Sequence, residues 1–155
     1  MKSKFEIFLD TDILNQSLSV GNFKEDSVFH RSIKLFDHCY TSVINAAELF
    51  SGCSGKRAAE KVKRSLVDVG ILGIPFRYSL SIADMMKATG KYGTGNNLRD
   101  AVILAMCSET RLPILTSNES RYKELAKKFK VKIISEEIVR NNTSPELIFK
   151  KAKIL

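Results

Sequence analysis

Five short runs with the character of strands, most of them apolar and each separated from the next by a segment of helical character, constrain the fold more than any other sequence feature. The runs cover residues 5–9, 39–42, 71–74, 113–116 and 131–134. Each is too short for an ordinary helix, and polar residues, glycine or proline lie at or next to its ends, which is typical of a buried strand. The predicted helices cover residues 27–38, 44–50, 56–69, 79–89, 100–107, 121–129 and 145–153.

Strands that alternate with helices predict an α/β fold, here a five-stranded parallel sheet with helices on both faces. The one clear glycine-rich loop spans residues 90–97, and no repeat or linker divides the chain. We therefore expect a single α/β/α domain over residues 1–155, with its core at about 5–135 and a basic helix and tail after it. A chain of 155 residues, 44% of them hydrophobic, is large enough to fold around its own core.

The composition argues against an exported or membrane-spanning protein. No apolar run approaches the roughly 18 residues of a membrane span, and the first residues lack the uncharged core of a signal peptide. The cysteines at positions 39, 53 and 107 form no Cys-x-x-Cys pair, which argues against structural zinc and a disulfide framework. We expect a cytoplasmic protein.

The formal net charge of +8 is unevenly distributed, since residues 121–155 contribute ten Lys or Arg and four Glu. A solvated helix face with a basic tail is one interpretation. The other is a surface that attracts phosphate groups, as in proteins that bind nucleic acids.

Acidic residues follow the predicted strands at the points where active sites of parallel sheets form. Asp10 follows the first strand, Glu48 lies in the helix after the second, and Asp100 opens the helix that leads to the fourth. The carboxyl ends of parallel strands share one edge of the sheet, so these side chains could meet there. Hard oxygen ligands would suit Mg²⁺ or Mn²⁺. Taken singly, each acid could instead cap a helix or lie in solvent.

Four segments in order resemble the motifs of PIN-domain nucleases. They are Phe-Leu-Asp-Thr-Asp-Ile-Leu at 8–14, Thr-Ser-Val-Ile-Asn-Ala-Ala-Glu-Leu at 41–49, Asp-Ala-Val-Ile-Leu-Ala at 100–105 and Pro-Ile-Leu-Thr-Ser-Asn-Glu-Ser-Arg-Tyr at 113–122. The resemblance covers about residues 5–135. It implies a five-stranded parallel sheet and a metal-dependent ribonuclease, and the small size resembles VapC-type toxins. Such toxins form homodimers and are held inactive by an antitoxin protein.

The resemblance also assigns roles to particular residues. Asp10, Glu48 and Asp100 match the three acids of the family and would hold Mg²⁺ or Mn²⁺ during hydrolysis of RNA. Asn118 stands where many members have Asp, so it would complete the catalytic set without a negative charge. The possible accessory residues are Asp12, Thr116 and Glu119. Arg99, Lys91 and Lys87 are weaker candidates for contacts with RNA, and residues 27–50 are the expected dimer contact.

Two alternatives remain open at the level of sequence. A haloacid-dehalogenase-like phosphatase would use Asp10 as nucleophile and Asp12 as general acid, although no Gly-Thr follows and Glu48 would have no role. A catalytically degenerate PIN-like module that binds RNA or protein is the second alternative, and Asn118 is its main support.

Clustered carboxylates repel one another when no metal is bound. On the sequence alone, Asp10→Asn is therefore expected to stabilise the metal-free protein.

Overall fold

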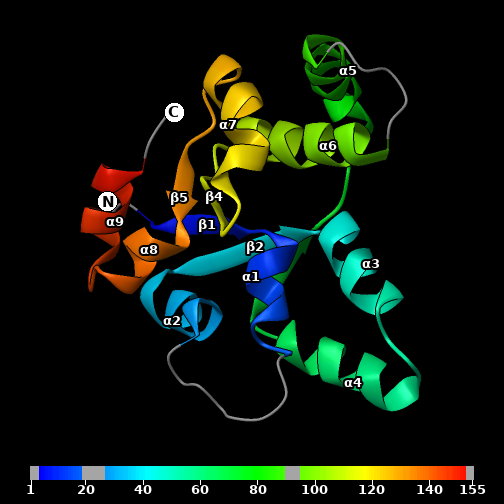
Figure 1. Cartoon of the computed structure of the whole chain (residues 1–155), viewed down its shortest axis with the longest axis vertical. Coiled ribbons are helices and arrows are strands. Elements are labelled where there is room, and N and C mark those ends of the chain that lie inside the picture. The colour runs from blue at the N-terminus through cyan, green and yellow to red at the C-terminus, as the bar shows by residue number, and fades with distance from the viewer. Residues whose placement is uncertain (1–3, 19–26, 90–94, 153–155) are drawn as a thin grey trace.

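The computed structural model describes residues 4–18, 27–89 and 95–152. Its centre is a five-stranded parallel sheet in the order β3-β2-β1-β4-β5 (Figure 1). The strands are β1 (Glu6–Leu9), β2 (His38–Ser42), β3 (Val69–Leu72), β4 (Ile114–Thr116) and β5 (Ile133–Ser135). The α/β fold with a five-stranded parallel sheet is thus confirmed.

Helices cover both faces of this sheet. They are α1 (Thr11–Asn15), α2 (Val28–Leu35), α3 (Val43–Ser51), α4 (Lys56–Ser65), α5 (Ser79–Ala88), α6 (Gly95–Thr110), α7 (Glu119–Lys128), α8 (Glu136–Arg140) and α9 (Pro145–Lys151), with a short 3₁₀ helix at Phe76–Tyr78. In Figure 1, α5, α6 and α7 lie on one side of the sheet, and α1, α2, α3 and α4 lie on the other.

The alternation of side chains along the central strand divides the core into two layers. Ile7 and Leu9 of β1 pack with α1, α2, α8 and α9, whereas Phe8 between them packs with α5, α6 and α7. All three side chains are fully buried. A strand with both faces covered by helices therefore reads as a continuous apolar run.

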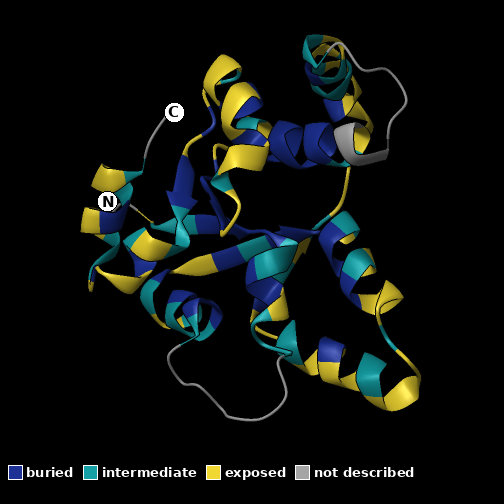
Figure 2. Ribbon diagram, viewed as in Figure 1, coloured by how far each residue is buried: buried dark blue, intermediate teal, exposed yellow. Residues whose placement is uncertain are grey.

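Helix α6 is the most deeply buried helix of its layer. Every residue from Ala101 to Cys107 is buried, and Figure 2 shows this stretch in dark blue. A helix that is apolar on all sides must be enclosed by protein, here by the sheet, α5 and α7. Its position carries Asp100 to the end of the sheet where β1 and β4 finish.

Two strands start two residues away from the sequence-based prediction, and one of them is β5, which was expected at 131–134 but runs from Ile133 to Ser135. β3 was expected at 71–74 but runs from Val69 to Leu72, because pairing places Val69 opposite Cys39 and Leu72 opposite Ser42. Helix α4 accordingly ends at Ser65 rather than at 69, and three turn residues separate it from the strand.

Several helices also differ from expectation: α2, expected at 27–38, ends at Leu35, and α7, expected at 121–129, begins at Glu119. Helix α6 begins at Gly95, so Asp100 lies in its second turn rather than at its start. Helices α1 and α8 were missed because each has only five residues. Both follow a strand directly, and each has an N-cap side chain, from Asp10 and Ser135, that accepts a backbone N–H.

No helix in the described part of the chain is both long and apolar enough to serve as a membrane span.

A pair of glycines tests the packing of the edge strand. Gly70 lies opposite Tyr40, and a Cβ atom there would come within 2.6 Å of Cδ1 of the tyrosine ring. We expect Gly70→Ala to lower the free energy of unfolding by about 1–2 kcal/mol, because the ring has to move. Gly73→Ala is the matched control, since its Cβ meets nothing within 4 Å. Urea denaturation of both variants checks the difference, and equal stabilities would contradict it.

Candidate active site

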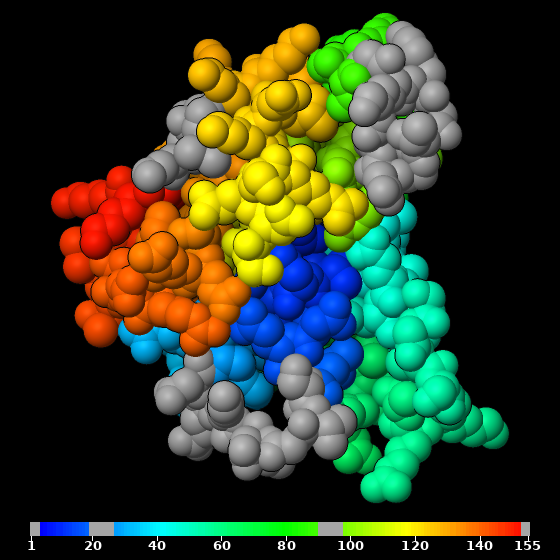
Figure 3. All heavy atoms as spheres, in the orientation of Figure 1, coloured from blue at the N-terminus to red at the C-terminus, as the bar shows by residue number. Residues whose placement is uncertain are grey.

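The carboxyl ends of β1, β2 and β4 place polar side chains at one edge of the sheet. Asp10 caps helix α1 directly after β1, and Ser42 caps α3 at the end of β2. Thr116 closes β4 and is fully buried. Figure 3 shows this side of the molecule, where α1 (blue), α3 (cyan) and the start of α7 (yellow) meet.

The Asp10 carboxylate lies at the centre of this edge and is only 3% exposed. From the described residues it accepts five hydrogen bonds. The donors to Oδ1 are the Thr11 backbone at 2.8 Å, Asn45 Nδ2 at 3.0 Å and Arg99 at 2.8 Å, and the donors to Oδ2 are Tyr122 at 2.7 Å and Thr116 at 3.3 Å. A buried charge requires this degree of compensation.

Arg99 joins the three acids that the sequence analysis singled out. Its guanidinium contacts Asp10 Oδ1, both carboxylate oxygens of Glu48, and Asp100 Oδ1 at 3.1 Å. We call the carboxylates of Asp10, Glu48 and Asp100 the acidic centre. Its members come from the end of β1, from α3 and from α6, so the fold does bring them together, around an arginine.

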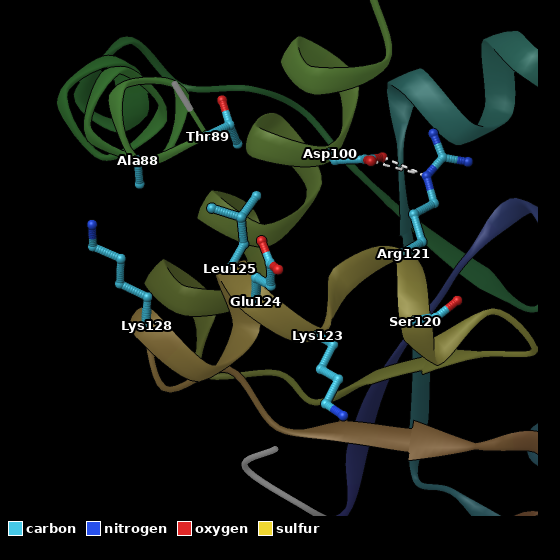
Figure 4. Close-up of a pocket in the computed structure, with 9 residues that line it drawn as sticks. All are labelled: Ala88, Thr89, Asp100, Ser120, Arg121, Lys123, Glu124, Leu125 and Lys128. Carbon is cyan, nitrogen blue, oxygen red and sulfur yellow. Dashed lines mark hydrogen bonds and ion pairs between the residues drawn. The ribbon is translucent and has the colours of Figure 1, made fainter. Parts of the chain in front are cut away.

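A second arginine closes the acidic centre on one side. Arg121 Nε donates to both oxygens of Asp100, at 2.8 and 2.9 Å. Figure 4 shows the Arg121 side chain reaching from α7 to this carboxylate. Asp100 is thereby held between two guanidinium groups.

Asp12 takes part in a neighbouring network rather than in the acidic centre. Its Oδ2 accepts hydrogen bonds from Thr116 at 2.9 Å and from the backbone and hydroxyl of Ser117 at 2.9 and 2.6 Å. Asp12 therefore fixes the turn after β4. Thr116 links the two networks because its hydroxyl also lies near Asp10.

The two candidates after β4 lie in different places. Asn118 lines the pocket that contains Asp10, Asp12, Glu48, Arg99 and Arg121, and its Oδ1 accepts a hydrogen bond from Ser120 at 2.9 Å. Glu119 instead lines a separate hollow with Ser135 and Glu137. Of the two, only Asn118 faces the acidic centre.

The candidate RNA contacts are also separated. Lys87 is exposed on α5 and lies 3.7 Å from Asp84, and it does not line the pocket of the acidic centre. Lys91 falls outside the described residues. Arg99 lines the pocket, but its side chain is only 12% exposed and its guanidinium contacts carboxylates.

Sequence reasoning missed the residues that orient Asp10. Asn45 lies three residues before Glu48, about one helical turn away on α3. The sequence motif that contains Glu48 therefore also contains Asn45. The Asn45 amide donates to Asp10 and, at 2.8 Å, to Thr11 Oγ1. Burial, followed by the nearby charge of Asp10, raises the pKa of Tyr122 well above its usual range. Tyr122 therefore remains a neutral phenol that donates to Asp10.

The donor types suit a divalent ion, but their arrangement does not present one. Carboxylate oxygens are the ligands that Mg²⁺ and Mn²⁺ prefer. Within the described ranges, however, no three acidic, histidine or cysteine side chains are grouped closely enough to hold a metal. The oxygens of the acidic centre are directed at Arg99 instead.

A second hollow adjoins the acidic centre and has a basic character. Asp100 and Arg121 line it together with Ala88, Thr89, Ser120, Lys123, Glu124, Leu125 and Lys128 (Figure 4). Neither Lys123 nor Lys128 forms an ion pair within the described part of the chain. Their charges are therefore available to an anion that approaches from solvent.

Comparison with known proteins identifies the family. The model of the PIN domain matches residues 7–128, so the chain belongs to the PIN domain family. A comparison with curated protein sequences gave no match.

Solved structures share the fold at low sequence identity. VapBC-1 from nontypeable Haemophilus influenzae is 18% identical with a TM-score of 0.63, over 85% of this chain and 98% of that one. VapBC-5 from Mycobacterium tuberculosis, of the VapBC family of toxin-antitoxin systems, is 18% identical with a TM-score of 0.57, over 84% and 98%. A toxin-antitoxin complex from Klebsiella pneumoniae is 24% identical with a TM-score of 0.55, over 75% and 89%.

The contacts of Asp10 reverse the stability effect expected from sequence alone. Arg99 already balances charge in the acidic centre, so replacing Asp10 removes attraction rather than repulsion. We predict that Asp10→Asn lowers the free energy of unfolding in chelator by about 1–3 kcal/mol. Asp84→Asn, which breaks only an exposed ion pair, is the control and should change stability by less than about 1 kcal/mol. A higher Tm for Asp10→Asn in chelator would instead support uncompensated repulsion.

Glu48 should contribute to the pH dependence of stability. Partial burial acts to raise its pKa, but hydrogen bonds from Arg99 and Thr11 hold the pKa below its ordinary value of 4.5. The stabilisation by the ionised form is therefore complete above pH 4.5 and is lost as the pH falls through the lowered pKa. We expect the stability difference between wild type and Glu48→Gln to shrink below pH 4.5 in chelator-containing buffer. A difference that stays constant on acidification would show that Glu48 has the same pKa in both states.

Proposed function

We propose that this chain is a metal-dependent ribonuclease that hydrolyses RNA phosphodiesters, and that it acts as the toxin of a toxin–antitoxin pair. The main support is the convergence of Asp10, Glu48 and Asp100 from three separate elements at the carboxyl end of a PIN-domain sheet. Membership of the PIN family also supports a nuclease function, since PIN domains are typically nucleases.

In this proposal the acidic centre binds the metal, and the residues around it keep the carboxylates in place. A bound Mg²⁺ or Mn²⁺ would supply an activated water and would neutralise charge on the phosphodiester. Asn45 and Tyr122 orient Asp10 through hydrogen bonds to its two oxygens. Asn118 offers an uncharged amide at the mouth of the same pocket. Asp12 acts indirectly, because it holds Thr116 and Ser117 in position.

The basic hollow next to the acidic centre is the proposed path of the RNA backbone. An acidic site repels RNA, so nearby cations have to supply the attraction. Lys123 and Lys128 extend from α7 and line the hollow together with Asp100 and Arg121, with Lys128 at the side away from these two residues (Figure 4). A phosphodiester chain that follows these lysines would be led directly to the acidic centre.

The assignment as a toxin rests on fold similarity to proteins solved as toxin–antitoxin complexes. An antitoxin protein, a homodimer and a cytoplasmic location belong to the same proposal. Exposed apolar side chains support association: Val43 and Phe50 lie on α3, within the contact expected at residues 27–50. Phe76 and Leu80, near the start of α5, are even more exposed, at 92% and 72%.

A non-catalytic PIN-like module that binds RNA or protein is the second candidate. Two observations favour it. Asn118 lacks the charge of a fourth acid, and Arg99 already fills the acidic centre. The phosphatase alternative is not favoured, because the family match is to the PIN domain and Asp12 is engaged with the turn after β4.

Cleavage of structured RNA in Mg²⁺ or Mn²⁺ tests the proposal. We expect wild type and Asp84→Asn to cleave, Asp10→Asn to be slower by about a hundredfold or more, and chelator to stop the reaction. Gel analysis of labelled RNA provides the rates. Cleavage that persists in chelator or is unchanged in Asp10→Asn would argue against this site. Binding of RNA without any cleavage by wild type would favour the non-catalytic module.

A further inference from the structure

Arg99 uses all three nitrogen atoms of its guanidinium within the pocket. Nε contacts Glu48, and NH2 lies 2.8 Å from Asp10 Oδ1 and 3.0 Å from Glu48 Oε2. NH1 lies 3.1 Å from Asp100 Oδ1 and 2.7 Å from the Tyr122 hydroxyl. The side chain therefore serves all three carboxylates of the acidic centre and is almost closed off from solvent, at 12% exposure.

The charges of the pocket explain why the arginine is held there. Among the described residues, Asp10, Asp12, Glu48, Arg99 and Arg121 line it, and Asp100 pairs with both arginines from beside it, so these four carboxylates and two guanidinium groups carry a formal charge of −2. Without Arg99 the same pocket would carry −3. Carboxylates at such close range repel strongly unless a cation lies between them. Arg99 supplies that cation from within the chain.

The guanidinium and a divalent ion in the acidic centre would compete for four of its six carboxylate oxygens. Arg99 contacts one oxygen of Asp10, one of Asp100 and both of Glu48. Arg99 directly precedes Asp100 on α6, so the chain keeps it beside the pocket even when its side chain swings away. The competitor is thus permanently present, unlike an ion from solution.

We propose that Arg99 is a tethered counter-cation that occupies the acidic centre in the metal-free protein and has to leave it before the centre can bind a divalent ion. This inference rests on the proposed metal-dependent function and adds a regulatory step to it. The apparent metal affinity then equals the intrinsic affinity multiplied by the fraction of molecules in which Arg99 has swung out, as for any site whose competent state is only partly populated.

Calorimetric titration with Mn²⁺ alone tests the proposal. We expect Arg99→Gln to bind Mn²⁺ more tightly than wild type by on the order of tenfold or more, because the competing cation is absent. In chelator the same variant should melt at a lower temperature, and saturating Mn²⁺ should raise its Tm by more than it raises that of wild type.

Arg121→Gln is the matched control. It removes the same charge from the same pocket, but Arg121 contacts only one member of the acidic centre, Asp100. A general electrostatic effect would strengthen Mn²⁺ binding similarly in both variants, whereas displacement predicts a clearly smaller gain for Arg121→Gln. Equal gains would overturn the proposal.

The remaining outcomes separate this inference from the proposed function. Binding by wild type with equal or weaker binding by Arg99→Gln overturns the inference alone. If neither protein binds Mn²⁺, both the inference and the metal-dependent function are overturned. If Arg99→Gln is unfolded in chelator, the titration is repeated with Arg99→Lys, because a lysine contacts fewer oxygens of the acidic centre than an arginine does. This variant should still bind Mn²⁺ more tightly than wild type, and binding that is no tighter overturns the inference.

Discussion

Burial of the Asp10 carboxylate is the constraint around which the functional edge of this molecule is organised. Because Asp10 is only 3% exposed, little water reaches its carboxylate, and donors from the protein have to balance the charge. Those donors come from α1, α3, α6, α7 and the end of β4. The helical layers on the two faces of the sheet are therefore joined at this edge through one side chain as well as through their separate cores.

The same requirement explains why the acidic centre contains an arginine. The parallel sheet brings β1, β2 and β4 to one edge, and the helices that follow or precede them carry the acids to that place. Without nearby cations, the three carboxylates of the acidic centre would repel one another strongly. Arg99 and Arg121 reduce that repulsion, and in the metal-free protein they make the cluster a source of cohesion between α3, α6 and α7. Such a site can be stable without metal. In our proposal, a metal ion can bind there only after Arg99 has left the acidic centre.

Several features of the fold could be predicted because they depend on local pattern. The five runs of strand character indicated five strands, and all five exist. In β1 the pattern is an apolar run because helices cover both faces of the strand. The limits of β3 could not be predicted, because the run at 71–74 continues beyond the part that β2 pairs with. The start of α6 was also missed, because glycine and asparagine at 95–97 are typical of a loop, although the helix begins at Gly95.

The sequence by itself determined the fold class, the polar residues that end β1 and β4, and the order of the acids along the chain. Periodicity, capping and charge are local properties, so they can be read from neighbouring residues. Only the tertiary structure decided that Glu119 faces another hollow, that Asp12 binds the turn after β4, and that Arg99 points into the acidic centre rather than toward solvent. The physical reason is that the direction of a long side chain depends on charges brought close by the fold, and residues 10, 48 and 100 become neighbours of Arg99 only after the sheet has formed.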